Sequence, residues 1–375
     1  MKKIAVCFGG ISPEHEVSII TGLQVIENID TTSFAVYPIY VSKEGEFFYL
    51  PQVMSRNDFL TSSKNPITFG RDNKGGYFQS SGLLGRKIYL DASYLAFHGG
   101  NGESGPIQGL FDTCGIPYTG QSVFTSCVSM NKQVTKELVA SLGVPTIPGL
   151  SFSTADIKMN TKAIVSKVSK KLGLPVIVKP VHLGSSIGVV VCESEVALTK
   201  ALLSSAHIDE EVVVEKLMKN FVEYNVAVRS IKGIPEVSEI EKPIKKDEIL
   251  SFADKYERGG GKKSGGMASL VRELPAKISS ALKKQIQEYA LNTYTALRAT
   301  GMLRCDFMYA NKKLYLVEVN PIPGSMSFYL WEASGISFSD QITSSLEEAL
   351  FVSEKSRSMR LTYDTDIVKS FVKAK

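Results

Sequence analysis

Four polar side chains that could hold a metal or stabilise negative charge stand on two neighbouring apolar segments. Arg304 and Asp306 alternate with apolar residues on the first segment, and Glu318 and Asn320 do so on the second. Because strand side chains repeat every second residue, a hairpin turning at residues 311–313 would place all four on one face. Such oxygen donors suit Mg²⁺, which also accepts waters and substrate phosphates as ligands. An acidic, solvated strand face is the alternative interpretation.

A glycine- and serine-rich segment, residues 182–188, follows the apolar run that contains Lys179. Such a loop between two strands can present backbone N–H groups and hydroxyls to a phosphate, and its small residues allow a close approach. Lys179 would add positive charge, whereas an ordinary hairpin turn is the alternative. Neither this segment nor Gly9 and Gly10 matches the Walker or dinucleotide-binding pattern, so neither a P-loop nor a Rossmann cofactor site is supported.

A third pattern is the apolar run 212–214, which leads into Glu215, Lys216 and Leu217. The backbone of such a strand can bind a base through hydrogen bonds, because its N–H and C=O groups need partners. A carboxylate eight positions on, Glu223, can bind ribose hydroxyls. A solvated Glu–Lys pair at the surface is the alternative.

The composition is that of an ordinary globular protein. Because 375 residues exceed one compact core, we expect two or three domains with clefts between them. At 43% hydrophobic and 22% charged residues, no apolar run approaches the ~20 residues of a membrane span, so we expect a soluble protein. The net charge of +5 lacks a basic stripe interleaved with aromatic residues, so we expect no nucleic-acid partner.

The amino terminus and the cysteines favour a cytoplasmic location. Residues 1–8 begin like a signal peptide, but two glycines end the apolar run too early, so we interpret 4–8 as a first strand. The five cysteines are odd in number and form no Cys-x-x-Cys pair. We therefore expect reduced core thiols.

Alternating strand and helix patterns predict a multidomain chain of α/β and α+β architecture. Residues 1–120 are expected to form an α/β domain with a mostly parallel sheet and an irregular stretch at 50–85. A central domain covers 121–210, a third domain with the acidic strands covers 211–352, and a loosely held appendage covers 353–375. The expected elements are strands at 4–8, 35–41, 94–97, 176–179, 188–191 and 211–215, and helices at 16–28, 131–142, 195–204 and 276–298.

These segments, in this order, resemble the D-alanine–D-alanine ligase family of the ATP-grasp superfamily. The resemblance implies an ATP-grasp fold behind an N-terminal parallel α/β (pre-ATP-grasp) domain. It runs from residue 3 to about residue 350, and its first two motifs are specific. The motifs are 9–18 (GGISPEHEVS), 98–109 (HGGNGESGPIQG), 130–132 (MNK), 178–188 (VKPVHLGSSIG), 215–216 (EK), 253–256 (ADKY) and 304–324, from Arg304 to Gly324.

The resemblance implies a two-step, ATP-driven ligation of two amino acids, with D-alanine favoured. One carboxylate attacks the γ-phosphate of ATP, and the amine of the second amino acid then attacks the acyl phosphate. It assigns the ATP phosphates to Lys132, Lys179 and Lys255, and the base and ribose to Glu215, Lys216, Leu217 and Glu223. Two Mg²⁺ ions, or Mn²⁺ in their place, would bind Asp306, Glu318 and Asn320. Surface solvation is the alternative for each lysine.

The catalytic groups implied by the resemblance are Glu14, Ser185, Tyr256, Arg304, Gly324 and His98. Arg304 and the backbone N–H of Gly324 would form an oxyanion hole, whereas an ion pair with Asp306 is the structural alternative for Arg304. Glu14 would orient the ammonium of the first amino acid and connect through Ser185 to Tyr256. His98 would lie near the transferred phosphate or the second substrate.

Tyr256 belongs to a lid candidate, residues 245–266. The glycines at 259–261 and 265–266 allow the backbone changes of a closing loop, and closure would keep water from the acyl phosphate. A disordered loop is the alternative. In the family, tyrosine at this position accompanies dipeptide formation, so the chain resembles the amine-using members.

The segment after Gly324 departs from the family. Residues 325–335 are several residues shorter and lack the usual grip on the carboxylate of the second substrate. Ser325 or Ser327 could replace that grip, or the pocket could take a different second amino acid, with the apolar residues of 328–331 lining it. Three hypotheses follow: a D-alanine–D-alanine ligase of peptidoglycan synthesis, a related ligase with another second substrate, and a non-catalytic nucleotide-binding paralogue. The resemblance also suggests a homodimer joined through the amino-terminal domains.

Overall fold

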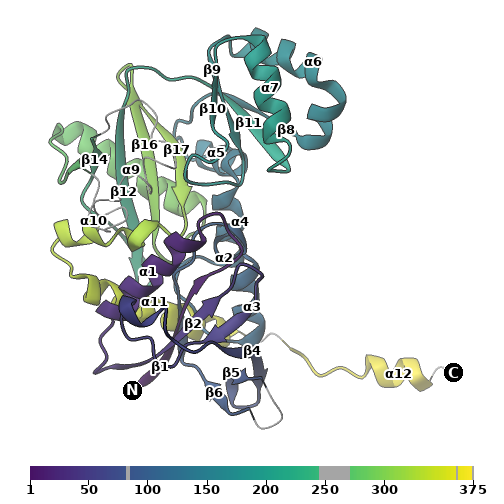
Figure 1. The fold of residues 1–375 in the computed structure, drawn as a ribbon, viewed down its shortest axis with the longest axis vertical. Helices are drawn as coiled ribbons and strands as arrows, with labels where there is room; N and C mark the ends of the chain where they lie inside the picture. Colours follow the sequence, from purple (N-terminus) through teal and green to yellow (C-terminus); the bar gives the residue numbers. More distant parts are fainter. Residues whose placement is uncertain (82–84, 245–270, 360–361, 374–375) are drawn as a thin grey trace.

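The part of the chain that the structure describes contains three large β-sheets and one two-stranded sheet (Figure 1). The computed structural model describes residues 1–81, 85–244, 271–359 and 362–373. None of the helices in these residues is both long and apolar enough to cross a membrane. The lid candidate, with Lys255 and Tyr256, lies outside the described residues.

The amino-terminal sheet has seven strands, in the spatial order β6 (Lys87–Tyr89), β5 (Gly75–Ser80), β4 (Asn65–Asp72), β3 (Phe47–Tyr49), β2 (Phe34–Val41), β1 (Lys2–Gly9) and β7 (Ala92–Leu95). β1 pairs in parallel with β2 and β7, and the other pairs are antiparallel. The prediction of a mostly parallel sheet therefore holds only for β2, β1 and β7 and is wrong for β3 to β6. The stretch 50–85, predicted to be irregular, contains the β4–β5 hairpin. In its turn, the Lys74 N–H donates a hydrogen bond to Asp72 Oδ1 at 2.9 Å.

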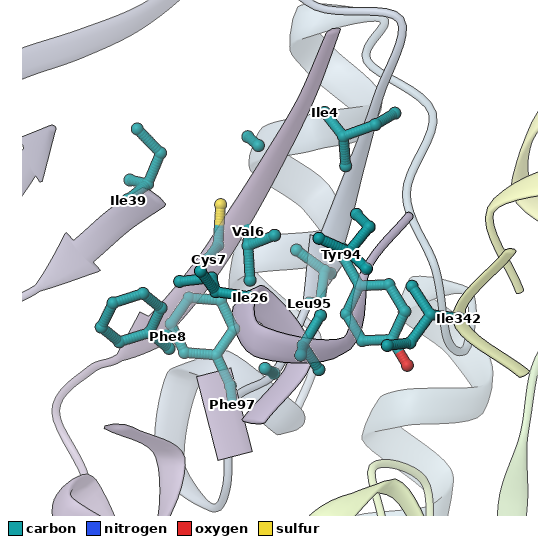
Figure 2. Packing of buried hydrophobic residues seen from close by; sticks show 14 of the residues in the cluster. Ile4, Val6, Cys7, Phe8, Ile26, Ile39, Tyr94, Leu95, Phe97 and Ile342 are labelled. Atoms are coloured by element: carbon teal, nitrogen blue, oxygen red, sulfur yellow. The ribbon is translucent and has the colours of Figure 1, made fainter. Parts of the chain in front are cut away.

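Strand β1 is buried on both faces, which explains its uninterrupted apolar sequence. Residues Ile4 to Phe8 are inaccessible to solvent, and helix α1 (His15–Asn28) packs against the strand. Figure 2 shows Ile26 of this helix beside Val6 and Phe8, and Tyr94 of β7 beside Ile342. Ile342 belongs to helix α11 (Phe338–Arg357), so a carboxy-terminal helix completes the core of the first domain.

The central sheet is antiparallel, in the order β10 (Val190–Cys192), β9 (Val176–Pro180), β11 (Glu211–Lys216) and β8 (Gly149–Ser153). Helices α6 (Thr154–Lys171) and α7 (Glu195–Ser205) pack beside it (Figure 1). The loop 182–188 joins two neighbouring strands, as predicted. Strand β11 lies in this sheet and not in the next, so the boundary predicted at residue 210 is wrong for this strand.

The third sheet is antiparallel, in the order β13 (Ile234–Val237), β12 (Val222–Ile231), β16 (Leu303–Ala310) and β17 (Lys313–Asn320). Strands β14 (Lys242–Pro243) and β15 (Arg272–Glu273) form the separate pair. Helix α9 (Ser280–Ala296) packs on the third sheet together with α5 (Lys132–Ala140), which follows α4 (Val123–Met130). Asn131 caps α5 by accepting the N–H groups of Gln133 and Val134, at 3.1 and 2.9 Å, and so places Lys132 at the first helical position.

The remaining elements are short, apart from α11. They are η1 (Arg56–Asp58), α2 (Gly100–Glu103), α3 (Pro106–Cys114), η3 (Gly324–Ser327), α10 (Phe328–Ala333) and α12 (Ile367–Lys373). Because α11 continues to Arg357, the appendage predicted from residue 353 begins inside a helix. Helix α12 stands away from the rest of the molecule (Figure 1).

Gly22 should be required by the contact between α1 and β1. An added Cβ there would lie 2.4 Å from Phe8 Cγ, whereas a Cβ at Gly109 of α3 would meet Val123 Cγ2 at an ordinary 3.8 Å. We expect Gly22→Ala to lower the free energy of unfolding by about 1–3 kcal/mol through overpacking. Gly109→Ala is the matched control and should be neutral or stabilising by up to ~1 kcal/mol. Thermal melts compare them; equal or higher stability of Gly22→Ala would contradict the packing argument.

Candidate active site

The cross-strand register of β16 and β17 brings the four predicted polar residues together. Arg304 lies opposite Asn320, and Asp306 lies opposite Glu318. The intervening Cys305 is part of the hydrophobic core. The single face inferred from the alternation is therefore confirmed.

Arg304 is buried and forms a two-pronged ion pair with Asp306. Its Nε lies 2.6 Å from Asp306 Oδ1, and its Nη2 lies 2.8 Å from Oδ2. Burial lowers the pKa of Arg304, but the charge and hydrogen bonds of Asp306, together with Tyr329 and Glu241, outweigh burial and hold the pKa well above its ordinary range. The ion pair with Asp306, the structural alternative for Arg304, is thus present. Arg304 Nη1, however, has no hydrogen-bond partner among the described residues. That nitrogen is left to donate to a ligand.

Two cavities meet at this sheet face. The smaller, about 70 Å³, is lined among others by Glu14, His98, Glu103, Ser185, Asn320 and Gly324. The larger, about 320 Å³, is lined among others by Lys179, Glu215, Lys216, Leu217, Glu223 and Asp306. Both include Lys132, Arg304 and Glu318 in their walls. A ligand in the larger cavity can therefore reach reacting groups in the smaller one.

The loop 182–188 reaches the amino-terminal domain at Glu14. Ser185 Oγ donates a hydrogen bond to Glu14 Oε1, and a Cβ on Gly184 would lie only 2.9 Å from Glu14 Oε2. Ser185 and Ser186 adopt positive φ values of 51° and 60°, which turns the loop toward that carboxylate. Two members of the predicted trio are in contact; Tyr256, the third, lies outside the described residues.

His98 lies in the wall of the smaller cavity, but both of its ring nitrogens have protein partners. Nδ1 is 3.1 Å from the Ile322 carbonyl oxygen, and Nε2 is 2.8 Å from Thr21 Oγ1. A neutral ring that donates from Nδ1 and accepts at Nε2 satisfies both contacts. Burial, against the opposing hydrogen bond with Ile322 and with help from the Arg304 charge, lowers the pKa of His98 to about 4. His98 is therefore uncharged at neutral pH, and its catalytic role stays a prediction.

Glu103 is a buried carboxylate of the same cavity, and the sequence analysis assigned it no role. It accepts the N–H of Gly99 at 2.7 Å and the N–H of Ile322 at 3.0 Å. Burial raises the pKa of Glu103 to about 8, the Glu14 charge adds to the rise, and the two N–H bonds oppose it. The motif at 98–109 contains Glu103, but nothing local indicates the contact with Ile322.

Lys132 and Lys179, two of the three lysines expected to bind the ATP phosphates, both line the larger cavity. Lys132 Nζ donates to the Leu183 carbonyl oxygen at 2.6 Å, and Lys179 Nζ lies 2.8 Å from Glu215 Oε2. Burial lowers the pKa of Lys132, and nearby carboxylates, Glu318 foremost, oppose that change. The surface alternative is wrong for Lys179, which is buried.

Glu215 is also buried, so the solvated Glu–Lys alternative is wrong for it, although Lys216 is exposed. Lys136, which the sequence analysis missed, forms a second ion pair with the Glu215 carboxylate. Its only local signal is its position one helical turn after Lys132 on α5. The Leu217 N–H donates to the Pro175 carbonyl oxygen at 3.3 Å.

The donor set at β16 and β17 fits Mg²⁺ by its chemistry. Asp306, Glu318 and Asn320 offer two carboxylates and an amide oxygen, and Asn320 Nδ2 already donates to Asp306 Oδ2 at 3.1 Å. Within the described ranges no group of three or more His, Cys, Asp or Glu side chains is arranged to hold a metal. Mg²⁺ usually completes its shell with water and substrate phosphate oxygens.

The segment after Gly324 is a tight buried turn. Ser325, Met326 and Ser327 all adopt left-handed φ values, 47°, 53° and 47°, at a cost that only surrounding structure can offset. Trp331 is 1% exposed, lies under the Arg229 guanidinium and lines neither cavity. The expectation that Trp331 lines the second-substrate pocket is therefore wrong, because its ring completes the core.

Comparison with known proteins identifies the family. The amino-terminal family described as D-ala D-ala ligase N-terminus matches residues 3–121, and that described as D-ala D-ala ligase C-terminus matches residues 138–347. A curated relative from Thermosipho melanesiensis, named D-alanine–D-alanine ligase, is 36% identical over 98% of this chain and 99% of its own length. The chain belongs to the D-alanine–D-alanine ligase family. Members of this family are ATP-dependent, ADP-forming ligases with the ATP-grasp fold, which confirms the predicted fold class and enzyme class.

Solved structures agree with this membership in the D-alanine–D-alanine ligase family. The D-alanine–D-alanine ligase of Coxiella burnetii superposes with a TM-score of 0.79 at 26% identity, covering 95% of this chain and 97% of that one. The VanG D-Ala:D-Ser ligase of Enterococcus faecalis superposes with a TM-score of 0.77 at 29% identity, covering 93% and 99%. The family therefore includes proteins of this fold with two named second substrates.

Burial of neutral His98 in this family member should make its stability depend on pH. The folded-state pKa near 4 lies below the ordinary 6.5, so only the unfolded chain takes up a proton between these values. Stability should therefore fall as pH drops from 6.5 to 4, by roughly 3 kcal/mol from this group. Urea unfolding at several pH values should show the wild-type advantage over His98→Asn shrinking across this window. His207→Asn, at an exposed histidine, is the control; a pH-independent difference for His98→Asn would contradict the assignment.

Proposed function

We propose that this chain joins two D-alanine molecules into D-alanyl-D-alanine for peptidoglycan precursors, converting ATP to ADP and phosphate. The observation that carries this is the pair of adjoining cavities with Arg304 in the shared wall. Lysines and a buried nucleotide-sized space lie on one side, and the Glu14 carboxylate lies on the other. The curated relatives named as D-alanine–D-alanine ligases support the substrate.

In the first step, a carboxylate oxygen of D-alanine attacks the γ-phosphorus of ATP and ADP leaves, which yields an acyl phosphate. Glu14 binds the ammonium of this substrate, and Ser185 holds Glu14 in place. Lys132 and Lys179, with Lys255 of the lid candidate, neutralise the phosphate oxygens, because charge there must be offset by fixed cations. Mg²⁺ bound by Asp306, Glu318 and Asn320 would neutralise further phosphate charge.

In the second step, the second D-alanine attacks the acyl carbon with its amine, after its ammonium has lost one proton. Phosphate then leaves, and the nitrogen loses one further proton to become the amide N–H. Negative charge develops on the acyl oxygen. Arg304 Nη1 and the Gly324 N–H donate to that oxygen. Tyr256, outside the described residues, is the proposed third member of the set formed with Glu14 and Ser185. The base and ribose of ATP lie against Glu215, Lys216, Leu217 and Glu223 in the larger cavity.

A second candidate differs only in the second substrate. The buried left-handed turn at 325–327 supports it, because this is where the chain departs from its family. Another D-amino acid, such as the D-serine named for the Enterococcus faecalis relative, would then replace the second D-alanine. From the family resemblance we also propose a cytoplasmic homodimer joined through the amino-terminal domains. Light scattering of the purified protein tests the dimer.

A substrate panel decides between these candidates. We expect ADP release from Mg²⁺-ATP with D-alanine alone, and a D-alanyl-D-alanine product by mass spectrometry. Each D- and L-amino acid should also be tried as a second partner. Turnover only with a different partner would support the second candidate. If no pair of amino acids raises ADP release above the background measured with ATP alone, the non-catalytic paralogue is supported.

Arg304→Ala should separate binding from catalysis. Loss of an oxyanion donor lowers turnover by ~100-fold or more, while the larger cavity still binds nucleotide. ATP affinity by calorimetry and ligation rate by coupled assay give the two quantities. Arg229→Ala is the matched control, since Arg229 is a buried, ion-paired arginine that lines neither of the two substrate cavities. Wild-type turnover in Arg304→Ala would rule out the oxyanion role.

A further inference from the structure

One buried carboxylate joins two parts of the candidate active site that are far apart in the chain. Glu103, at the end of α2, is 5% exposed. Its Oε2 accepts the Gly99 N–H at 2.7 Å, and its Oε1 accepts the Ile322 N–H at 3.0 Å. The second contact spans 219 residues. Glu103 therefore ties the amino-terminal domain to the segment that precedes Gly324.

The Gly99 side of this contact borders the first-substrate site. A Cβ on Gly99 would lie 2.5 Å from Ser12 Oγ and 2.9 Å from Glu14 Oε2. Ser12 Oγ also accepts the Glu14 N–H at 3.0 Å. The position of the Gly99 backbone thus determines how closely the wall approaches the Glu14 carboxylate.

The Ile322 side borders the oxyanion hole. The Ile322 carbonyl oxygen is 3.1 Å from His98 Nδ1, so both polar backbone groups of Ile322 contact the segment 98–103. Pro321 and Pro323 flank Ile322 and restrict the backbone on either side. A displacement of Ile322 is therefore transmitted to Gly324 and not absorbed between them.

We propose that Glu103 is a positioning residue that sets the spacing between the first-substrate site at Glu14 and the oxyanion donors at Gly324 and Arg304. This rests on the proposed ligase function. A carboxyl group suits the task because each of its two oxygens can accept an N–H group.

Glu103→Gln tests the proposal. The glutamine NH₂ would face one of the two N–H groups, so one contact is lost. We expect turnover at saturating substrates to fall about 10- to 100-fold, as a misplacement of about 1 Å does elsewhere, with the KM for ATP changed less than about 2-fold because the nucleotide cavity does not include Glu103. Glu103→Asp, which keeps the carboxyl group but is one methylene shorter, should lose one contact as well.

Glu348→Gln is the matched control. Glu348 is also a buried carboxylate that accepts a backbone N–H, from Gly233 at 3.1 Å, and a hydroxyl, from Ser230 at 2.6 Å, but it lines neither substrate cavity. Its variant should lower the melting temperature without changing turnover of the folded enzyme. If both variants lower melting temperature and leave turnover equal to wild type, Glu103 is only structural and the proposal is wrong.

Hydrogen exchange supplies a readout that does not require activity. We expect exchange of the Ile322 amide to accelerate at least about 10-fold in Glu103→Gln and to stay unchanged in Glu348→Gln. Unchanged exchange would overturn the contact, and faster exchange with wild-type turnover would overturn its positioning role. Absence of D-alanine ligation by the wild-type enzyme would overturn the proposed function instead, whatever the exchange shows. Glu103→Gln and His98→Ala should also be non-additive in turnover, because both act on Ile322.

Discussion

The buried ion pair between Arg304 and Asp306 is the interaction on which the candidate site depends. An unpaired guanidinium in the protein interior would cost several kcal/mol, so Asp306 determines both that Arg304 stays buried and where it points. Asp306 engages Nε and Nη2, and Nη1 has no hydrogen-bond partner among the described residues. The same carboxylate belongs to the proposed metal set, so a bound cation and the guanidinium share one anion. Asp306 and Glu318 give this face two carboxylates for one guanidinium, so a bound cation would offset the extra negative charge.

Buried charges of both signs also meet around Glu215. This carboxylate contacts the ammonium groups of Lys136 and Lys179, and Lys132 starts the same helix as Lys136. Glu318 lies near all three lysines as well. Lys132 and Lys179 stand in the wall of the larger cavity, where fixed cations can offset the charge of a polyphosphate.

Local periodicity predicts the part of the site that lies on neighbouring strands. It does not predict the contacts between residues far apart in the chain. The period of two on β16 and β17 predicts the common face of Arg304 and Asp306 because neighbours on one strand determine it. The contact of Ser185 with Glu14 spans 171 residues, and only the family resemblance indicated it. The contact of Glu103 with Ile322 had no indication at all. Backbone N–H groups look alike in every sequence, so a carboxylate that binds two of them leaves no pattern.

Strand β11 was assigned to the wrong domain because its neighbours in the sheet, too, are set by long-range pairing. An apolar run such as 212–214 reports burial on both faces but not which strands lie beside it. In the structure β11 lies between β8 and β9. That position takes Glu215, at the end of the strand, out of solvent, and a buried carboxylate must find cations. Whether Glu215 is a surface charge or part of a nucleotide pocket is therefore decided by sheet topology, which is a property of long-range pairing and not of the local sequence.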